Sequence, residues 1–155
     1  MKLFVIIFIL SCPVGFFQKE ECKCSQPPPG AKTSWGQENV IIKQDQPLKF
    51  LHGKIIVSSG EKPLAGALVE VYDKPEALLL GWKEREARKD EQRKIAACVT
   101  GEDGEFCFDK MPAGKYELRC SKPVEWNCTS IYVVVDPKQN NGMASQIVVP
   151  MHISQ

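Results

Sequence analysis

The sequence has 155 residues, which is enough for one domain with a hydrophobic core of its own. Its 20 basic and 19 acidic side chains nearly cancel, leaving a formal net charge of +1. This balance disfavours binding driven by overall charge, either to nucleic acid or to anionic membranes, so we expect no nucleic-acid partner.

The N-terminus has the pattern of a secretory signal. Lys2 is followed by an apolar run from Leu3 to Leu10. Such a run suits a signal of about 7–15 apolar residues and is too short for a membrane span of about 20. The sequence Ile9-Leu10-Ser11-Cys12 resembles the lipobox of bacterial lipoproteins, in which the cysteine is acylated and becomes the mature N-terminus. We predict a signal peptide over residues 1–17, with a cut before Cys12 and lipid attachment there.

Residues 18–47 are polar and rich in turn-forming residues. The run Gln26-Pro27-Pro28-Pro29-Gly30 favours an extended polyproline spacer. We predict that this segment tethers a lipid to a folded domain, with a short strand at residues 39–42 joining that domain.

From Leu48 onward the pattern changes to short alternating strands separated by turn sequences. Seven strands at this spacing predict an all-β sandwich over residues 48–155. In chain order they are expected near residues 50–57, 67–72, 95–100, 106–108, 116–118, 131–135 and 146–149.

Residues 73–94 depart from the strand pattern. Leu78-Leu79-Leu80 and Trp82 precede a run of charged helix formers, with opposite charges three and four residues apart. We predict a short helical insertion whose charged residues form a solvated face.

The seven cysteines indicate an oxidising compartment once the export signal is considered. With Cys12 set aside for lipid, six remain as disulfide candidates, and fifteen connectivities are possible. The six are Cys22, Cys24, Cys98, Cys107, Cys120 and Cys128.

Two pairings are expected from local pattern. Gly101-Glu102-Asp103-Gly104 favours a β-hairpin. If Phe106 and Val99 face inward, Cys107 and Cys98 face outward and lie opposite each other, which predicts a Cys98–Cys107 bond. Cys120 and Cys128 flank a short loop and form the second expected pair.

The order of the strand motifs resembles that of the carboxypeptidase regulatory-like domain, a prealbumin-like (transthyretin-like) fold. The resemblance covers roughly residues 50–120 and implies a seven-stranded Greek-key β-sandwich. The motifs that carry it are His52-Gly53-Lys54-Ile55, Pro63-Leu64-Ala65-Gly66-Ala67-Leu68-Val69-Glu70, Thr100-Gly101-Glu102-Asp103-Gly104-Glu105-Phe106 and Met111-Pro112-Ala113-Gly114-Lys115-Tyr116.

The residues of enzymes with related folds are missing. The chain has only His52 and His152, with no His-x-His pair for iron, and it lacks the Tyr-Arg-Gly-Ser ending of hydroxyisourate hydrolases. We therefore predict no catalytic residues, no metal and no cofactor. Lys54, Glu117 and Asn140 are loose candidates for the isopeptide bond found in adhesin domains of this fold.

The combined features predict a non-catalytic binding or scaffolding module, exported and lipid-anchored in the cell envelope. Its partner would be an envelope protein or glycan, and it would touch the membrane only through the lipid. Trp82 and Trp126 are the binding candidates, because indole is common in protein and glycan contacts; both could instead cap the core. The alternatives are a freely secreted or periplasmic disulfide-stabilised module, and an unrecognised enzyme on the same fold.

Overall fold

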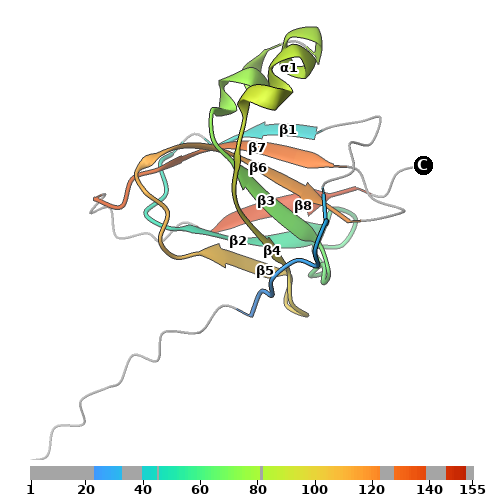
Figure 1. The fold of residues 1–155 in the computed structure, drawn as a ribbon. Coiled ribbons are helices and arrows are strands. Elements are labelled where there is room, and N and C mark those ends of the chain that lie inside the picture. The colour runs from blue at the N-terminus through green and yellow to red at the C-terminus, as the bar shows by residue number, and fades with distance from the viewer. Residues whose placement is uncertain are drawn as a thin grey trace, which may run out of the picture.

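The computed structural model describes residues 23–32, 40–44, 46–80, 82–122, 128–138 and 146–152. These ranges contain eight strands and one α-helix (Figure 1). The strands are β1 (Val40–Lys43), β2 (Leu51–Val57), β3 (Leu68–Tyr72), β4 (Lys94–Val99), β5 (Glu105–Phe108), β6 (Gly114–Ser121), β7 (Thr129–Val135) and β8 (Ile147–Met151), and the helix is α1 (Trp82–Arg88).

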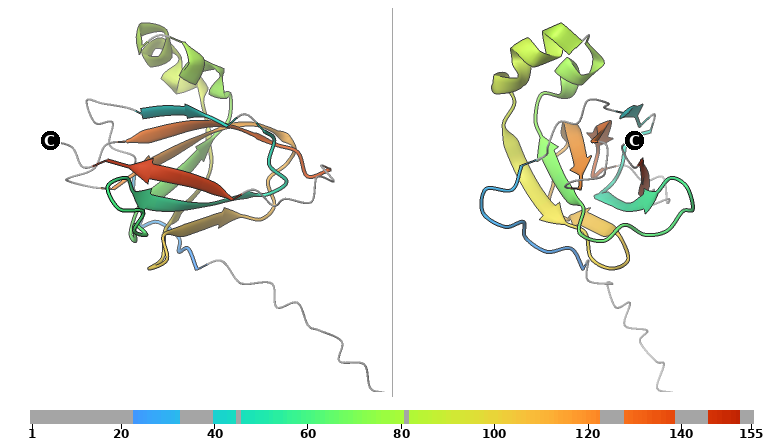
Figure 2. Two further views of the ribbon diagram at one scale, coloured as in Figure 1. Left: turned by 180° about the vertical axis from the view of Figure 1, so that it is seen from behind. Right: turned by 90° about the vertical axis from the view of Figure 1, so that its right-hand side faces the viewer.

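The strands form two sheets packed face to face (Figures 1 and 2). The five-stranded sheet has the order β1-β7-β6-β3-β4, and the three-stranded sheet has the order β5-β2-β8. β1 pairs with β7 and β2 with β8 in parallel, whereas the other pairs are antiparallel. The predicted all-β sandwich is therefore confirmed: β2–β8 correspond to the seven expected strands, and β1 to the short strand near residues 39–42.

The core lies between the sheets and follows the two-residue period of the strands. The five-stranded sheet contributes Val69, Val71 and Leu118, while the three-stranded sheet contributes Ile55 and Phe106. All five side chains are buried, and for β5 this agrees with the inward position expected for Phe106. This burial of apolar surface is the main favourable term in folding.

The turn at Gly101–Gly104 does not form the predicted hairpin. The amide of Gly104 donates to the carbonyl of Gly101 at 3.0 Å, and Gly104 has φ +72°, as a tight turn requires. However, β4 pairs with β3 in one sheet and β5 pairs with β2 in the other. The turn therefore carries the chain from one sheet to the other, and its two arms are not hydrogen-bonded neighbours.

The facing expected for β4 is wrong as well. Cys98 lies opposite Val69 in the β3–β4 ladder, and both side chains belong to the core. Val99 lies opposite Leu68, on the other face of the sheet. Cys98 thus points inward and is 5% exposed, which removes the geometry from which the Cys98–Cys107 bond was predicted.

The N-terminal segment lies along the edge of the sandwich. Ser25 forms a two-way backbone bridge to Val99 on β4, at 2.9 and 2.8 Å. The expected polyproline stretch ends in a turn, because the amide of Ala31 donates to the carbonyl of Pro28 at 3.1 Å and Gly30 has φ +79°. Pro29-Gly30 is the preferred pair for the centre of a type II turn. Parts of the predicted 18–47 tether therefore pack on the domain.

The predicted helical insertion is present. It contains α1 and two 3₁₀ segments, Pro75–Leu79 and Lys89–Glu91, and it stands at the top of Figure 1. Leu78, 1% exposed, anchors it by packing toward the outer face of the five-stranded sheet. Among the described helices, none is long and apolar enough to cross a membrane.

Gly53 on β2 provides a test of the sandwich packing. A methyl group there would overlap the Phe106 ring and approach the carbonyl oxygen of Ile147 to 2.6 Å. We expect Gly53→Ala to lower the free energy of unfolding by about 1–3 kcal/mol, as for other overpacked cores. Gly60→Ala, where nothing lies within 4 Å of the added carbon, is the control and should leave stability nearly unchanged. Urea unfolding of the two variants measures the difference, and equal stabilities would contradict the packing described.

Candidate functional site

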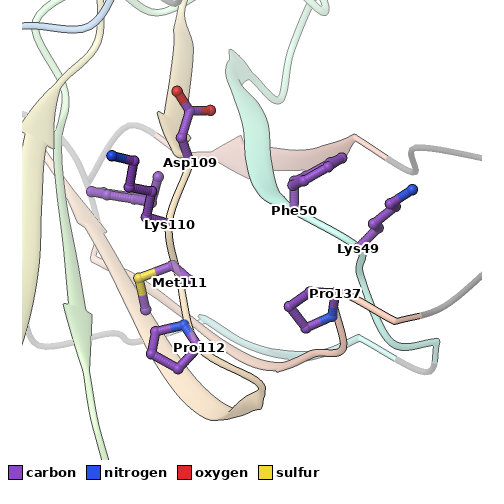
Figure 3. Close-up of a pocket in the computed structure, with 8 residues that line it drawn as sticks. Lys49, Phe50, Asp109, Lys110, Met111, Pro112 and Pro137 are labelled. Atoms are coloured by element: carbon purple, nitrogen blue, oxygen red, sulfur yellow. The ribbon is translucent and has the colours of Figure 1, made fainter.

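An open groove of about 290 Å³ lies where β2 begins and β5 ends (Figure 3). Three segments that are distant in the sequence line it: residues 49–50 before β2, residues 108–112 from the end of β5 onward, and Pro137 after β7. Its apolar surface comes from Phe50, Phe108, Met111, Pro112 and Pro137. In Figure 3 the side chains of residues 109–112 and those of Lys49, Phe50 and Pro137 stand on opposite sides of the open space.

The rim of this groove is basic. Asp109 is its one acidic lining residue, and the carboxylate lies 3.0 Å from Nε2 of His52. The His52 ring stacks on Phe50 with 5.7 Å between ring centroids. Lys49 and Lys110 are exposed, and within the described part of the chain neither takes part in an ion pair. The groove therefore combines an apolar lining with two lysines, and the ammonium nitrogen of Lys49 lies 5.5 Å from the centroid of the Phe50 ring.

The two histidines form separate polar pairs. His52 meets Asp109 at one end of β2, whereas Nδ1 of His152 lies 3.0 Å from the hydroxyl of Ser58 beyond the other end. Ser58 comes six positions after His52 along an extended strand, which corresponds to about 20 Å. A serine, a histidine and a carboxylate are therefore present but do not converge, as acyl-transfer catalysis would require. Among the described residues, no group of three or more His, Cys, Asp or Glu side chains could hold a metal ion.

A second cluster of polar residues lies under the helical insertion. Glu117 on β6 is completely buried on the outer face of the five-stranded sheet. Its carboxylate accepts hydrogen bonds from Arg85 of α1, Arg119 of β6 and Gln92, each at 2.8 Å. Arg85 also donates to the hydroxyl of Ser130 on β7 at 3.1 Å. We call Arg85, Gln92, Glu117, Arg119 and Ser130 the insertion network.

The insertion network holds the helical insertion against the five-stranded sheet through buried ion pairs. Burial alone would raise the pKa of Glu117, but the hydrogen bonds and charges of Arg119, Gln92 and Arg85 outweigh it and hold that pKa below its ordinary value. Two guanidinium groups thus neutralise one buried carboxylate and tie α1 to β6 and β7. Most charged residues of the insertion are exposed as predicted, but Arg85 is 5% exposed, and the charge pattern alone did not distinguish it from its neighbours.

Cysteines from three segments meet at the edge between the sheets. Sγ of Cys24 lies 4.0 Å from Sγ of Cys107 and 3.8 Å from the carbonyl oxygen of Cys107. A disulfide bond needs about 2.05 Å, so these two sulfur atoms are close but not bonded to each other. Burial, followed by the influence of Cys24, raises the pKa of Cys98. Cys24 is therefore a described cysteine whose sulfur atom lies close to that of Cys107.

Cys120 and Cys128 occupy different environments. Cys120 belongs to the core between the sheets, and burial raises its pKa well above the ordinary value. Cys128 is also buried, but the charges that act on it come from Arg119, Arg85, Glu117 and Glu70 on the outer face. Both are thiols in the structure, as is Cys98. The short loop between them suggested a bond, whereas strand alternation turns the two side chains to opposite faces of the sheet.

Several predicted site residues cannot be compared with the structure. Cys12, Cys22, Trp126 and Asn140 lie outside the described residues, and the side chain of Trp82, at the start of α1, does too. Of the isopeptide candidates, Lys54 lies on β2 and Glu117 on β6, in different sheets, so these two are not brought together. The groove was missed by sequence reasoning because its lining residues were interpreted only as strand ends and turns.

The insertion network predicts a large effect of Glu117→Gln. The variant keeps the side-chain size but leaves Arg85 and Arg119 buried with no carboxylate, which we expect to cost about 3–5 kcal/mol in the free energy of unfolding. Glu84→Gln changes an exposed glutamate of α1 and should change stability by no more than about 0.5 kcal/mol. Urea unfolding at pH 7 measures both, and similar values for the two would contradict a buried ion pair.

The pH dependence should follow the lowered pKa of Glu117. Because the folded-state pKa lies below the ordinary value of 4.5, the carboxylate contributes its full stability above that pH. The contribution is lost as the pH falls through the folded-state value. We expect unfolding free energy to decline more steeply below pH 4.5 in the wild type than in Glu117→Gln. Parallel pH profiles would contradict this assignment.

The buried thiols predict slow alkylation. Burial raises the pKa of Cys128 to about 12 and raises those of Cys98 and Cys120 also, so few thiolates are present at pH 8. We expect iodoacetamide to modify these three cysteines roughly 100-fold more slowly in the native protein than in urea. Peptide mass mapping over time measures each rate. Rapid labelling, or a Cys120–Cys128 disulfide in the native protein, would contradict the structure.

Comparison with known proteins agrees with the architecture. A search of curated proteins finds no match to the chain. The family model of the SpaA prealbumin-like fold domain matches residues 54–145, which is more than half of the chain. Domains of this family are commonly non-catalytic structural modules and occur in surface proteins of bacteria. The prealbumin-like part of the expected resemblance is confirmed, while the carboxypeptidase regulatory-like assignment stays a prediction. The chain belongs to the SpaA prealbumin-like fold domain family.

Proposed function

We propose that the chain is an exported, lipid-anchored module of the cell envelope that binds or scaffolds a partner without catalysis. The observation that carries the proposal is a surface-protein fold that follows a signal-like N-terminus containing Cys12. The partner would be a protein or glycan of the envelope, with Trp82 and Trp126 as further contact candidates. No nucleic acid and no cofactor enter the proposal.

The position of Ser25 limits how far the domain can stand from the membrane. Ser25 pairs with β4, so the free linker after an acylated Cys12 ends no later than Cys24. Twelve residues extend to at most about 40 Å. A tether of this length keeps the sandwich within about one domain diameter of the lipid surface and favours partners that are themselves held in the envelope.

We also propose that an N-terminal cysteine is bonded to Cys107. The support is that Cys107 takes part in a disulfide bond, whereas Cys24, whose sulfur atom lies 4.0 Å away, is a thiol. Cys22, two residues before Cys24 in the sequence, is the other N-terminal candidate for this bond. Such a bond would transmit load from the anchor directly to the three-stranded sheet.

Intact mass and fractionation test the anchor. We expect a membrane-associated species whose mass begins at Cys12 and includes acyl chains, and we expect Cys12→Ser to release the protein from the membrane fraction. Masses before and after reduction and alkylation count the disulfides, and non-reducing peptide mapping identifies the partner of Cys107. Ser11→Ala is the matched control, because it leaves the lipid-bearing thiol in place.

A soluble, unacylated species that lacks about the first fifteen residues would remove the lipid anchor and favour the freely secreted or periplasmic module. Retention of the uncut N-terminus would overturn export by this signal. Absence of Cys107 from every disulfide-linked peptide would overturn the covalent link to the N-terminal segment without affecting the anchor.

A further inference from the structure

We propose that the groove beside β2 and β5 binds an acidic peptide segment, one in which an aromatic or aliphatic side chain is flanked by carboxylates. The proposal deepens the binding role proposed above by naming the site and the chemistry of its ligand. It does not depend on the lipid anchor.

The apolar residues of the groove can receive an apolar side chain of the ligand. Phe50 is 42% exposed, and it lies on the same side of the groove as Lys49 and Pro137 in Figure 3. Met111 and Phe108 are partly buried against the core and line the groove from the β5 side. An inserted apolar side chain would remove surface on both partners from water.

The two lysines of the groove can attract carboxylates of the ligand. Lys49 and Lys110 stand on opposite sides of the groove in Figure 3. The carboxylate of Asp109 is engaged by His52 at 3.0 Å, which reduces the repulsion that a second carboxylate would meet. The chain has a formal net charge of only +1, so an attraction for acidic ligands must come from such local clusters.

The openness and polarity of the groove favour a peptide over a small molecule or a glycan. Pockets for drug-sized molecules occupy about 300–1,000 Å³ and enclose most of the ligand, whereas this groove has about 290 Å³ and is open. It accommodates one or two side chains of a longer segment. Glycan binding needs several hydrogen-bonding groups, but the lining offers the paired Asp109 and two lysines among apolar residues. A peptide with carboxylates on both sides of an apolar residue fits this distribution best.

Binding of three fluorescein-labelled peptides to the full mature chain tests the proposal: DELFDE, the charge-reversed KRLFKR, and DESGDE, which lacks the apolar centre. We expect DELFDE to bind at least about tenfold more tightly than either of the others, and we expect its binding to weaken as salt rises from 50 to 500 mM. Amide chemical shifts should change around residues 49–50 and 108–111.

Charge reversal at the rim gives the decisive comparison. Lys49→Glu/Lys110→Glu should weaken DELFDE binding at least about tenfold and should bind KRLFKR more tightly than the wild type does. Lys62→Glu/Lys83→Glu makes the same change in net charge at exposed lysines outside the groove and should retain DELFDE binding. Phe50→Ala, at a partly exposed position, should weaken binding to a similar degree while the unfolding transition is kept.

Two results would overturn the proposal. One is equal affinity for DELFDE and KRLFKR, or for DELFDE and DESGDE. The other is an equal loss in the rim variant and the distant lysine variant, which would show a response to net charge alone. Neither result affects acylation of Cys12, so failure here is distinguishable from failure of the proposed anchor.

Discussion

Strand β3, which lies between β6 and β4, is buried on both faces, and this burial constrains the layers on either side of it. Val69 and Val71 face the core between the sheets, while Glu70 on the opposite face is also completely buried. A sheet with two covered faces needs a cover on its outer side, and here the helical insertion provides one. The cover brings Arg85 inward to pair with Glu117 at 2.8 Å, and Lys94 on the neighbouring strand β4 pairs with Glu70 at 3.0 Å.

Burial of the strand faces explains which features of the fold could be predicted from the sequence. Alternation of apolar residues predicted the inward position of Phe106 on β5, because burial selects one of the two alternating sets of residues along a strand. The turn at Gly101–Gly104 was misassigned because a glycine-rich turn has the same local chemistry in a hairpin and in a crossing between sheets. Only the pairing of β4 with β3 and of β5 with β2 distinguishes the two. That pairing depends on contacts distant in sequence.

The candidate site was less predictable than the strands, because it also depends on contacts between residues that are distant in sequence. The groove joins residues near 50, 110 and 137, and its character comes from their juxtaposition. Cys24 and Cys107 are 83 residues apart, and no local spacing relates them. Likewise, Arg85 is one of many charged residues in its segment, and only the position of Glu117 on β6 selects it for burial. Sequence patterns report periodicity within an element, whereas a site is set by the packing of several elements.

The fold separates stability from recognition. The core and the insertion network hold the two sheets and α1 together with groups that solvent does not reach, so they can tolerate little change. The groove is built mainly from residues before, between and after strands, where side chains can change at small cost to the core. Family membership therefore accounts for the scaffold, while the proposed ligand choice would depend on a few exposed residues such as Lys49 and Phe50. Salt at physiological concentration screens surface charges beyond about 8 Å. The charges of the groove therefore act only on a partner that is already close. A short tether would supply that proximity, since it would confine the groove to the zone where envelope partners are found.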